Sequence, residues 1–294
     1  MLKMQRMKPG NPKNCLICQS KNYRVIFSYD EPDQYEVAVG VGKEKYFRKW
    51  VQCRNCGFCY SVYSRDKNII DKIYTSAYRD KNALWRGGSP EEIFRRVIAL
   101  PERESETKLR VRWIKKSISD VWKHGLLEQD APPYNVLDVG GGTGVFAYEF
   151  QDANWVVHVI DPNKDSGFIK TKLHIPLVQR YYKPGNFHHK FNLITLIYVL
   201  EHLSDPISFL KNLHNDMEDK SFLFVEVPDA ICLEYKPAED DIFNSCHLWM
   251  FGPTAITLLL SACGFEVLNL YRTRTIRGHY ALMILVGRER REKK

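Results

Sequence analysis

The stretch Val136-Leu-Asp-Val-Gly-Gly-Gly-Thr-Gly-Val-Phe-Ala147 decides the fold class of this chain of 294 residues. A short apolar run leads into a turn of closely spaced glycines, and the turn leads into a helix-like segment. Glycines reach positive φ and let a ligand approach the backbone closely, while the first turn of a helix offers unpaired N–H donors. The stretch therefore predicts a strand, a ligand-binding turn and a helix, although the glycines alone also fit a nicotinamide dinucleotide.

The second half of the chain alternates short apolar runs with helix-like stretches. The apolar runs cover 135–139, 155–160, 193–199 and 222–227, and the helix-like stretches include 145–151 and 205–213. Continuous apolar strands separated by helices are typical of a parallel sheet covered on both faces, which indicates a doubly wound α/β fold. Two further strands are expected at 265–274 and 280–286, and only five residues join them. They can pair antiparallel, but they leave no room for a helical crossover.

Two acidic residues stand near the glycine turn. Asp138 precedes the first glycine by two residues, where a carboxylate favours a positively charged ligand group. Asp161 follows the next apolar run and is placed to accept hydrogen bonds from ribose hydroxyls. Together with Asp161, the motif Asp138-x-Gly140-x-Gly142-x-Gly144 and the segment Val199-Leu-Glu-His-Leu-Ser-Asp-Pro206 resemble the class I S-adenosylmethionine-dependent methyltransferases over roughly residues 105–287.

This resemblance implies a seven-stranded Rossmann-like sheet with S-adenosylmethionine as the cofactor. It also implies that the backbone at Gly140 and Gly142 meets the methionine part, that Asp161 holds the adenosine ribose, and that Asp138 orders the ammonium side. The segment after the fourth strand of such a sheet faces the same cleft. The residues there that we expect to contact substrate or shape its pocket are Tyr198, Glu201 and His202.

Four of the eight cysteines form two pairs, Cys15-x2-Cys18 and Cys53-x2-Cys56, with 34 residues between the pairs. Each C-x2-C turn presents two thiolates to one metal ion, so we expect a closed structural zinc site. Cys59 forms a further C-x2-C with Cys56 and is the alternative ligand, while redox pairing and coincidence are competing interpretations. The basic start of the chain lacks the apolar block of a secretory signal, so we expect a reducing cytoplasm.

A cysteine module ahead of such a cofactor domain resembles the sugar C-methyltransferases of antibiotic and surface-polysaccharide pathways. The segment Phe243-Asn-Ser-Cys-His-Leu-Trp-Met-Phe251 is similar to their Tyr-His-Glu-His-Leu-Ser-Tyr-Phe stretch, in which the second histidine, matched by His247, serves as the base. Asn244 replaces the tyrosine and Cys246 the glutamate, so O-methylation fits as well as C-methylation. The other interpretations of His247 are substrate binding and a structural role, and His202 is a second candidate for proton transfer.

The link between the last two expected strands carries two further candidates for substrate binding, Arg277 and His279. The resemblance places this hairpin near the substrate mouth, and Arg272 and Arg274 precede the link. Guanidinium groups match phosphate oxygens bidentately, which predicts that a phosphorylated group binds here. A solvated hairpin face is the alternative interpretation.

The charge distribution indicates what kind of partner the chain meets. The formal net charge is +8, with +9 in residues 1–100 and −1 in the rest. A positive field favours anionic partners, and no apolar run reaches the ~18 to 20 residues of a membrane helix. We therefore expect methylation of a small, anionic, sugar-like or phosphorylated metabolite. Methylation of RNA or another nucleic acid is less favoured, because the chain has no dense Lys/Arg run, and a zinc-containing scaffold without activity is the third hypothesis.

Length and pattern together predict three units. Residues 1–65 form the zinc-binding module, 66–104 a helical connector or lid, and 105–294 the S-adenosylmethionine-binding domain.

Overall fold

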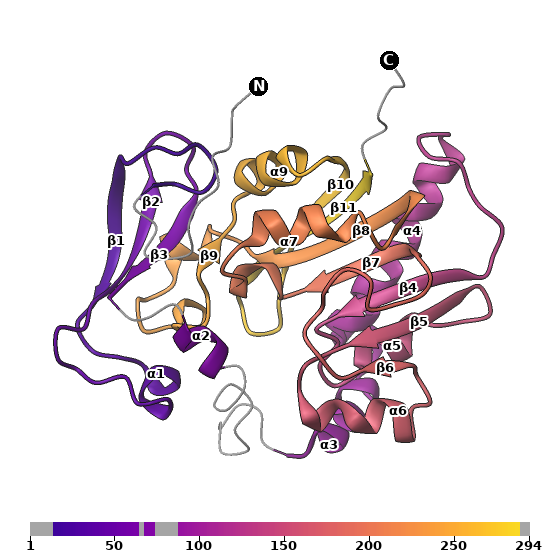
Figure 1. Ribbon diagram of the computed structural model, residues 1–294, viewed down its shortest axis with the longest axis horizontal. Coiled ribbons are helices and arrows are strands. Elements are labelled where there is room, and N and C mark those ends of the chain that lie inside the picture. Colours follow the sequence, from indigo (N-terminus) through magenta and orange to yellow (C-terminus); the bar gives the residue numbers. More distant parts are fainter. Residues whose placement is uncertain (1–13, 65–67, 74–87, 289–294) are drawn as a thin grey trace.

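The computed structural model of the protein describes residues 14–64, 68–73 and 88–288 (Figure 1). The basic start of the chain, the charged tail from 289 onward, and residues 66–67 and 74–87 of the connector expected at 66–104 lie outside the described residues.

A seven-stranded sheet forms the larger part of the molecule, with the strand order β10-β11-β8-β7-β4-β5-β6. Its strands are β4 (Tyr134–Val139), β5 (Trp155–Ile160), β6 (Leu177–Val178), β7 (Phe191–Ile197), β8 (Met217–Pro228), β10 (Phe265–Arg274) and β11 (Tyr280–Arg288). The five strands from β8 to β6 pair in parallel, whereas β11 pairs antiparallel with both β8 and β10. The predicted α/β fold with a mostly parallel sheet and a terminal antiparallel pair is confirmed.

Helices cover both faces of this sheet. They are α3 (Pro90–Ile98), α4 (Glu106–Lys123), α5 (Val145–Phe150), α6 (Phe168–Lys172), α7 (Pro206–Leu213) and α9 (Pro253–Ala262), with a shorter α8 (Cys232–Tyr235) after β8. Successive side chains of a strand point to opposite faces. In β4, Leu137 therefore packs in the cluster that includes α7 and α9, while Val136 packs in the cluster that includes α4 and α5.

A second, four-stranded antiparallel sheet lies beside the first and has the order β1-β2-β3-β9. It consists of β1 (Tyr23–Tyr29), β2 (Arg48–Cys53), β3 (Cys59–Tyr63) and β9 (Trp249–Met250), and the short helices α1 (Gln34–Ala38) and α2 (Asn68–Lys72) accompany it. Three of its strands come from the start of the chain, but β9 lies between β8 and α9 (Figure 1). This sheet is therefore built from residues about 190 positions apart, such as Tyr60 and Trp249.

Among the helices that the structure describes, none combines the length and the apolar character that crossing a bilayer requires.

Candidate active site

The glycine turn between β4 and α5 adopts a backbone that side chains rarely tolerate. Gly140, Gly142 and Gly144 have φ values of +74°, +61° and +71°. Gly141 has an ordinary φ, but a Cβ added there would lie 2.6 Å from Cγ1 of Val159 and 2.8 Å from Oδ2 of Asp138. The turn therefore runs close to the ends of β4 and β5, as a ligand-binding backbone requires.

Asp138 and Asp161 lie beside the glycine turn, and Asp161 is hydrogen-bonded to it. Oδ1 of Asp138 accepts a hydrogen bond from the Thr195 hydroxyl at 2.7 Å, while its buried Oδ2 has no hydrogen-bond partner among the described residues. Burial raises the pKa of Asp138 to about 7. Oδ2 of Asp161 accepts from the Gly142 N–H at 2.9 Å. A buried carboxylate oxygen beside a positive-φ glycine turn fits the ammonium end of S-adenosylmethionine, so the donor set suits that cofactor.

The close approach at Gly141 leads to a stability prediction. Gly141→Ala is expected to lower the free energy of unfolding by about 1–3 kcal/mol, because the new methyl group overpacks against Val159 and Asp138. Chemical denaturation measures this difference. Gly42→Ala is the matched control, since nothing lies within 4 Å of its added Cβ. A Gly141→Ala protein as stable as the control would contradict the tight turn.

The end of β7 connects this turn to a cavity. A Cβ added at Gly140 would lie 3.0 Å from Cγ2 of Val199, so the residues after β7 rest on the turn. The preceding residue, Tyr198, has a φ of +54°, which is uncommon for a tyrosine and is often found at functional sites. Tyr198 and Pro228, at the carboxyl ends of β7 and β8, line a cavity of about 230 Å³.

Five residues that the sequence singled out line this cavity: Tyr198, His202, His247, Arg277 and His279. Glu201 is not among the lining residues, but its Oε1 lies 3.8 Å from Nε2 of His202. The remaining lining residues were not predicted as site residues, and they are Tyr35, Glu106, Pro228, Asp241, Ile242, Asn244, Thr275 and Tyr280. Tyr35 belongs to α1 and Glu106 begins α4, so the wall combines segments whose association no local motif signals.

A hydrogen bond to the backbone fixes the orientation of the His247 ring and the position of its proton. Its Nδ1 lies 2.6 Å from the Ile242 carbonyl oxygen. Since a carbonyl only accepts, Nδ1 carries the proton and the lone pair is on Nε2. Burial lowers the pKa of His247 to about 4, although the Ile242 carbonyl and Asp241 act in the opposite direction.

His202 and Glu201 complete a compact group with His247. Nδ1 of His202 lies 3.0 Å from the Cys246 carbonyl oxygen, which places its proton on Nδ1 as well. The centroids of the two imidazole rings are 4.8 Å apart. Nε2 of His202 lies 3.8 Å from Oε1 of Glu201, whose carboxyl group is fully buried. Burial raises the pKa of Glu201 well above its ordinary value.

The cationic groups expected to hold phosphate already contact carboxylates. Arg277 pairs with Asp241 at 3.0 Å, and Nε2 of His279 lies 2.8 Å from Oδ1 of Asp240. Arg272, farther along the hairpin, pairs with Asp229. Binding a phosphate at these side chains would have to displace or share these carboxylates.

The N-terminal sheet holds the segment that carries His247. The carboxylate of Asp33 accepts from the Ser245 N–H at 2.6 Å and from the Ser245 hydroxyl at 2.8 Å. The buried Arg48 donates from Nη1 to the Phe243 carbonyl oxygen at 2.6 Å. Sequence reasoning missed Asp33 and Arg48. Arg48 stands two positions before Trp50 and so shares its strand face. A charged residue on the same face as a tryptophan was the available signal for Arg48.

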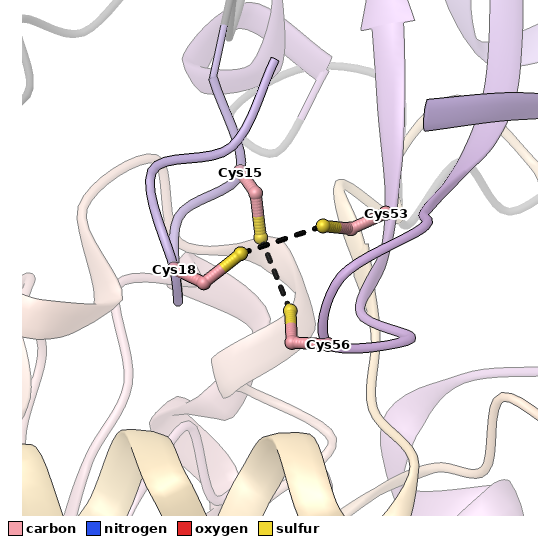
Figure 2. A group of neighbouring side chains, drawn as sticks. All are labelled: Cys15, Cys18, Cys53 and Cys56. Carbon is pink, nitrogen blue, oxygen red and sulfur yellow. Dashed lines mark hydrogen bonds between the residues drawn. The ribbon is translucent and has the colours of Figure 1, made fainter. Parts of the chain in front are cut away.

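The four predicted zinc ligands lie together beside this sheet (Figure 2). Sγ of Cys15 is 3.5 Å from Sγ of Cys56, and Sγ of Cys18 is 3.5 Å from Sγ of Cys53. These separations are far longer than a disulfide bond and close to the ~3.8 Å between thiolates on one tetrahedral zinc ion.

Local backbone geometry also suits a metal at this cluster. The backbone N–H groups of Cys18 and Ile17 lie toward Cys15 and partly offset the rise in its pKa that burial causes. Cys59, the alternative ligand, lies apart. It contacts the Gly57 carbonyl oxygen at 3.4 Å, and burial raises its pKa to about 12. The four residues that fit a zinc ion are therefore Cys15, Cys18, Cys53 and Cys56.

Comparisons with known proteins agree with this fold. Residues 91–270, more than half of the chain, match a family described as "Methyltransferase domain". No match was found among curated protein sequences.

Several solved structures are similar to this chain at low sequence identity. A 1,6-didemethyltoxoflavin-N1-methyltransferase from Burkholderia thailandensis is 15% identical over 62% of this chain and 79% of its own, with a TM-score of 0.47. A magnesium protoporphyrin IX methyltransferase from Synechocystis PCC 6803 is 14% identical over 68% and 95%, with a TM-score of 0.47. An S-adenosylmethionine-dependent methyltransferase from Clostridium acetobutylicum ATCC 824 is 12% identical over 68% and 99%, with a TM-score of 0.48.

Proposed function

Because this chain belongs to the family of methyltransferase domains and is an S-adenosylmethionine-dependent methyltransferase, we propose that it methylates a small sugar-like molecule in the cavity of His202 and His247. The observation that carries this proposal is the fixed tautomer of His247 on the cavity wall, at the carboxyl ends of β7 and β8. Ligands of open α/β sheets bind at these strand ends.

The cofactor and the acceptor would occupy adjoining places. When bound, S-adenosylmethionine supplies an electrophilic methyl group. The backbone at Gly140 and Gly142 would hold its methionine part, Asp138 would face its ammonium group, and Asp161 would hold its ribose. Val199 packs on Gly140 of the turn, and the neighbouring Tyr198 lines the cavity. An acceptor in the cavity could therefore be aligned with the methyl group.

His247 would take the proton of an acceptor hydroxyl or acidic C–H through Nε2. The Nδ1–H bond to the Ile242 carbonyl oxygen holds the ring in place while the proton is accepted. Asp241 would stabilise the imidazolium that forms. The remaining lining groups include Tyr35, Asn244 and Thr275, which donate and accept hydrogen bonds without net charge and thus suit sugar hydroxyls.

Methyl transfer to pooled acceptors tests the substrate class. The full chain is incubated with S-adenosylmethionine that carries a labelled methyl group and, separately, with free sugars, nucleotide sugars, glycan precursors and RNA. We expect label in one of the sugar-containing pools. Label on RNA alone would overturn the sugar-like acceptor.

A substitution tests the role of His247. His247→Ala is expected to reduce turnover about 100-fold at saturating acceptor while leaving the affinity for S-adenosylmethionine unchanged, because only proton transfer is lost. His188→Ala, at an exposed histidine that does not line the cavity, is the matched control. Unchanged turnover in His247→Ala would remove His247 as the base.

A further inference from the structure

A second group of metal-ligating side chains lies at the wall of the cavity, apart from the four cysteines. Glu201 and His202 belong to the short turn after β7, and His247 belongs to the segment before β9. One ligand atom of each lies within 4.8 Å of the other two. The two segments are joined by a backbone hydrogen bond from the Leu248 N–H to the Glu201 carbonyl oxygen at 2.8 Å, so the fold itself fixes their spacing.

Both histidines are oriented as metal ligands usually are. A metal-bound imidazole typically donates its second N–H to a carbonyl or carboxylate, which fixes the tautomer and the direction of the ring. Nδ1 of His202 makes this contact to the Cys246 carbonyl oxygen and Nδ1 of His247 to the Ile242 carbonyl oxygen. The lone pair of each neutral ring is consequently on Nε2.

Glu201 supplies the independent observation that points to a cation. Its side chain is fully buried, and neither carboxylate oxygen has a hydrogen-bond partner among the described residues. Burying a carboxyl group without partners is costly, and natural proteins rarely do so without an ion or water at the site. Nε2 of His202 lies 3.8 Å from Oε1 of Glu201.

We propose that Glu201, His202 and His247 bind a divalent transition-metal ion. Two imidazole nitrogens and one carboxylate suit Zn²⁺, Co²⁺ or Ni²⁺, whereas Mg²⁺ and Ca²⁺ prefer oxygen ligands only. Three protein ligands leave a coordination position open, and this position faces the cavity because His202 and His247 line it. An oxygen of a small molecule in the cavity is the fourth ligand that this arrangement takes.

The ion and the acceptor proton compete for one atom. Nε2 of His247 accepts either the metal or the proton, so the metal-bound form cannot use His247 as a base. The inference concerns binding to the protein alone and stands whether or not the proposed methyl acceptor is correct.

Cobalt binding tests this site. The full chain is first loaded with one equivalent of zinc per chain, which the four thiolates hold most tightly, and it is then titrated with Co²⁺ in equilibrium dialysis. We expect one Co²⁺ per chain, with a visible spectrum that lacks thiolate-to-cobalt charge transfer. Glu201→Gln and His247→Ala should each weaken this binding by about tenfold or more, and His188→Ala should not change it. No stoichiometric Co²⁺ in the wild type, or equal affinity in both site variants, would overturn the proposal.

A measurement on the unaltered protein removes any dependence on how the variants fold. Bound Co²⁺ should broaden the imidazole NMR signals of His202 and His247 and leave those of His188 unchanged. Signals of His202 and His247 that persist at saturating Co²⁺ would overturn the site. Failure of either test leaves the His247→Ala turnover experiment, done without added metal, as a separate test of the proposed function.

Discussion

Cys53→Ser is expected to abolish zinc binding at the four-cysteine cluster, which lowers bound zinc by one ion per chain, and to unfold the sheet of β1, β2 and β3. Cys53 ends β2 and supplies one of four thiolates, and a structural zinc site contributes roughly 10–16 kcal/mol at neutral pH. A contribution of this size is as large as the whole stability of a typical domain, so its loss is expected to unfold the strands that carry the cluster. Atomic absorption measures the metal, and limited proteolysis measures the folding of residues 14–64.

Loss of this sheet should also reduce methyl transfer. The segment with His247 is held by Asp33 and Arg48. Asp33 precedes α1 in the connection from β1 to β2, and Arg48 begins β2, the strand that ends in the ligand Cys53. Cys59→Ala is the matched control, since Cys59 is a buried neighbour that contacts Gly57 instead of the cluster. It should keep its zinc. Zinc retained by Cys53→Ser but lost from Cys59→Ala would show that the ligand set is wrong.

Arg110→Met is expected to lower the free energy of unfolding by about 3–5 kcal/mol. Arg110 of α4 and Glu226 of β8 form a buried, bidentate ion pair in which Nη2 lies 2.7 Å from Oε1. Removing the guanidinium leaves the buried Glu226 carboxylate without a cation. The desolvation free energy of that charge is then no longer offset by an ion pair. The midpoint of chemical denaturation should shift accordingly.

Two comparisons isolate the buried charge as the cause. In the double variant Arg110→Met/Glu226→Gln the orphaned charge is absent, so most of the lost stability should return. Arg112→Met removes a partner of Glu102 from an exposed ion pair on the same helix and should change stability little. A double variant no more stable than Arg110→Met would show that packing, and not charge, accounts for the loss.

Most of the parallel part of the seven-stranded sheet could be predicted because its strands are short apolar runs, and the run 155–160 coincides with β5. The expected strand at 265–274 coincides with β10, and the five-residue link after it does join an antiparallel pair. The glycine turn was predictable for a similar reason, since its backbone demands residues without a side chain. Here local chemistry and the final fold agree.

The second sheet could be predicted only in part. The short β-like runs at 23–29 and 46–52 of the sequence correspond to β1 and β2, but no pattern in the sequence indicates β9. A strand of two residues has no periodicity, and β9 exists because β3 offers it a partner. The same holds for Asp33 and Ser245, which are 212 positions apart.

The candidate site shows the same division between local motif and tertiary contact. Topology predicts that His202 and Tyr198 lie at the strand ends, and the structure places them beside His247, Arg277 and His279 around one cavity. Their roles remain predictions. What no local pattern revealed is the set of carboxylates opposite the cations. Asp241 lies 36 positions before Arg277, and only the packed chain brings the two charges together.

The late position of β9 in the chain affects how the protein is made. β3 emerges from the ribosome about 190 residues ahead of the strand that covers its edge, and the Ser61 N–H that will bond to the Leu248 carbonyl oxygen stays exposed during that time. An uncovered strand edge is a site for association with other chains. At a typical synthesis rate of about 5–20 residues per second, this vulnerable interval lasts on the order of 10 to 40 seconds for every newly made copy.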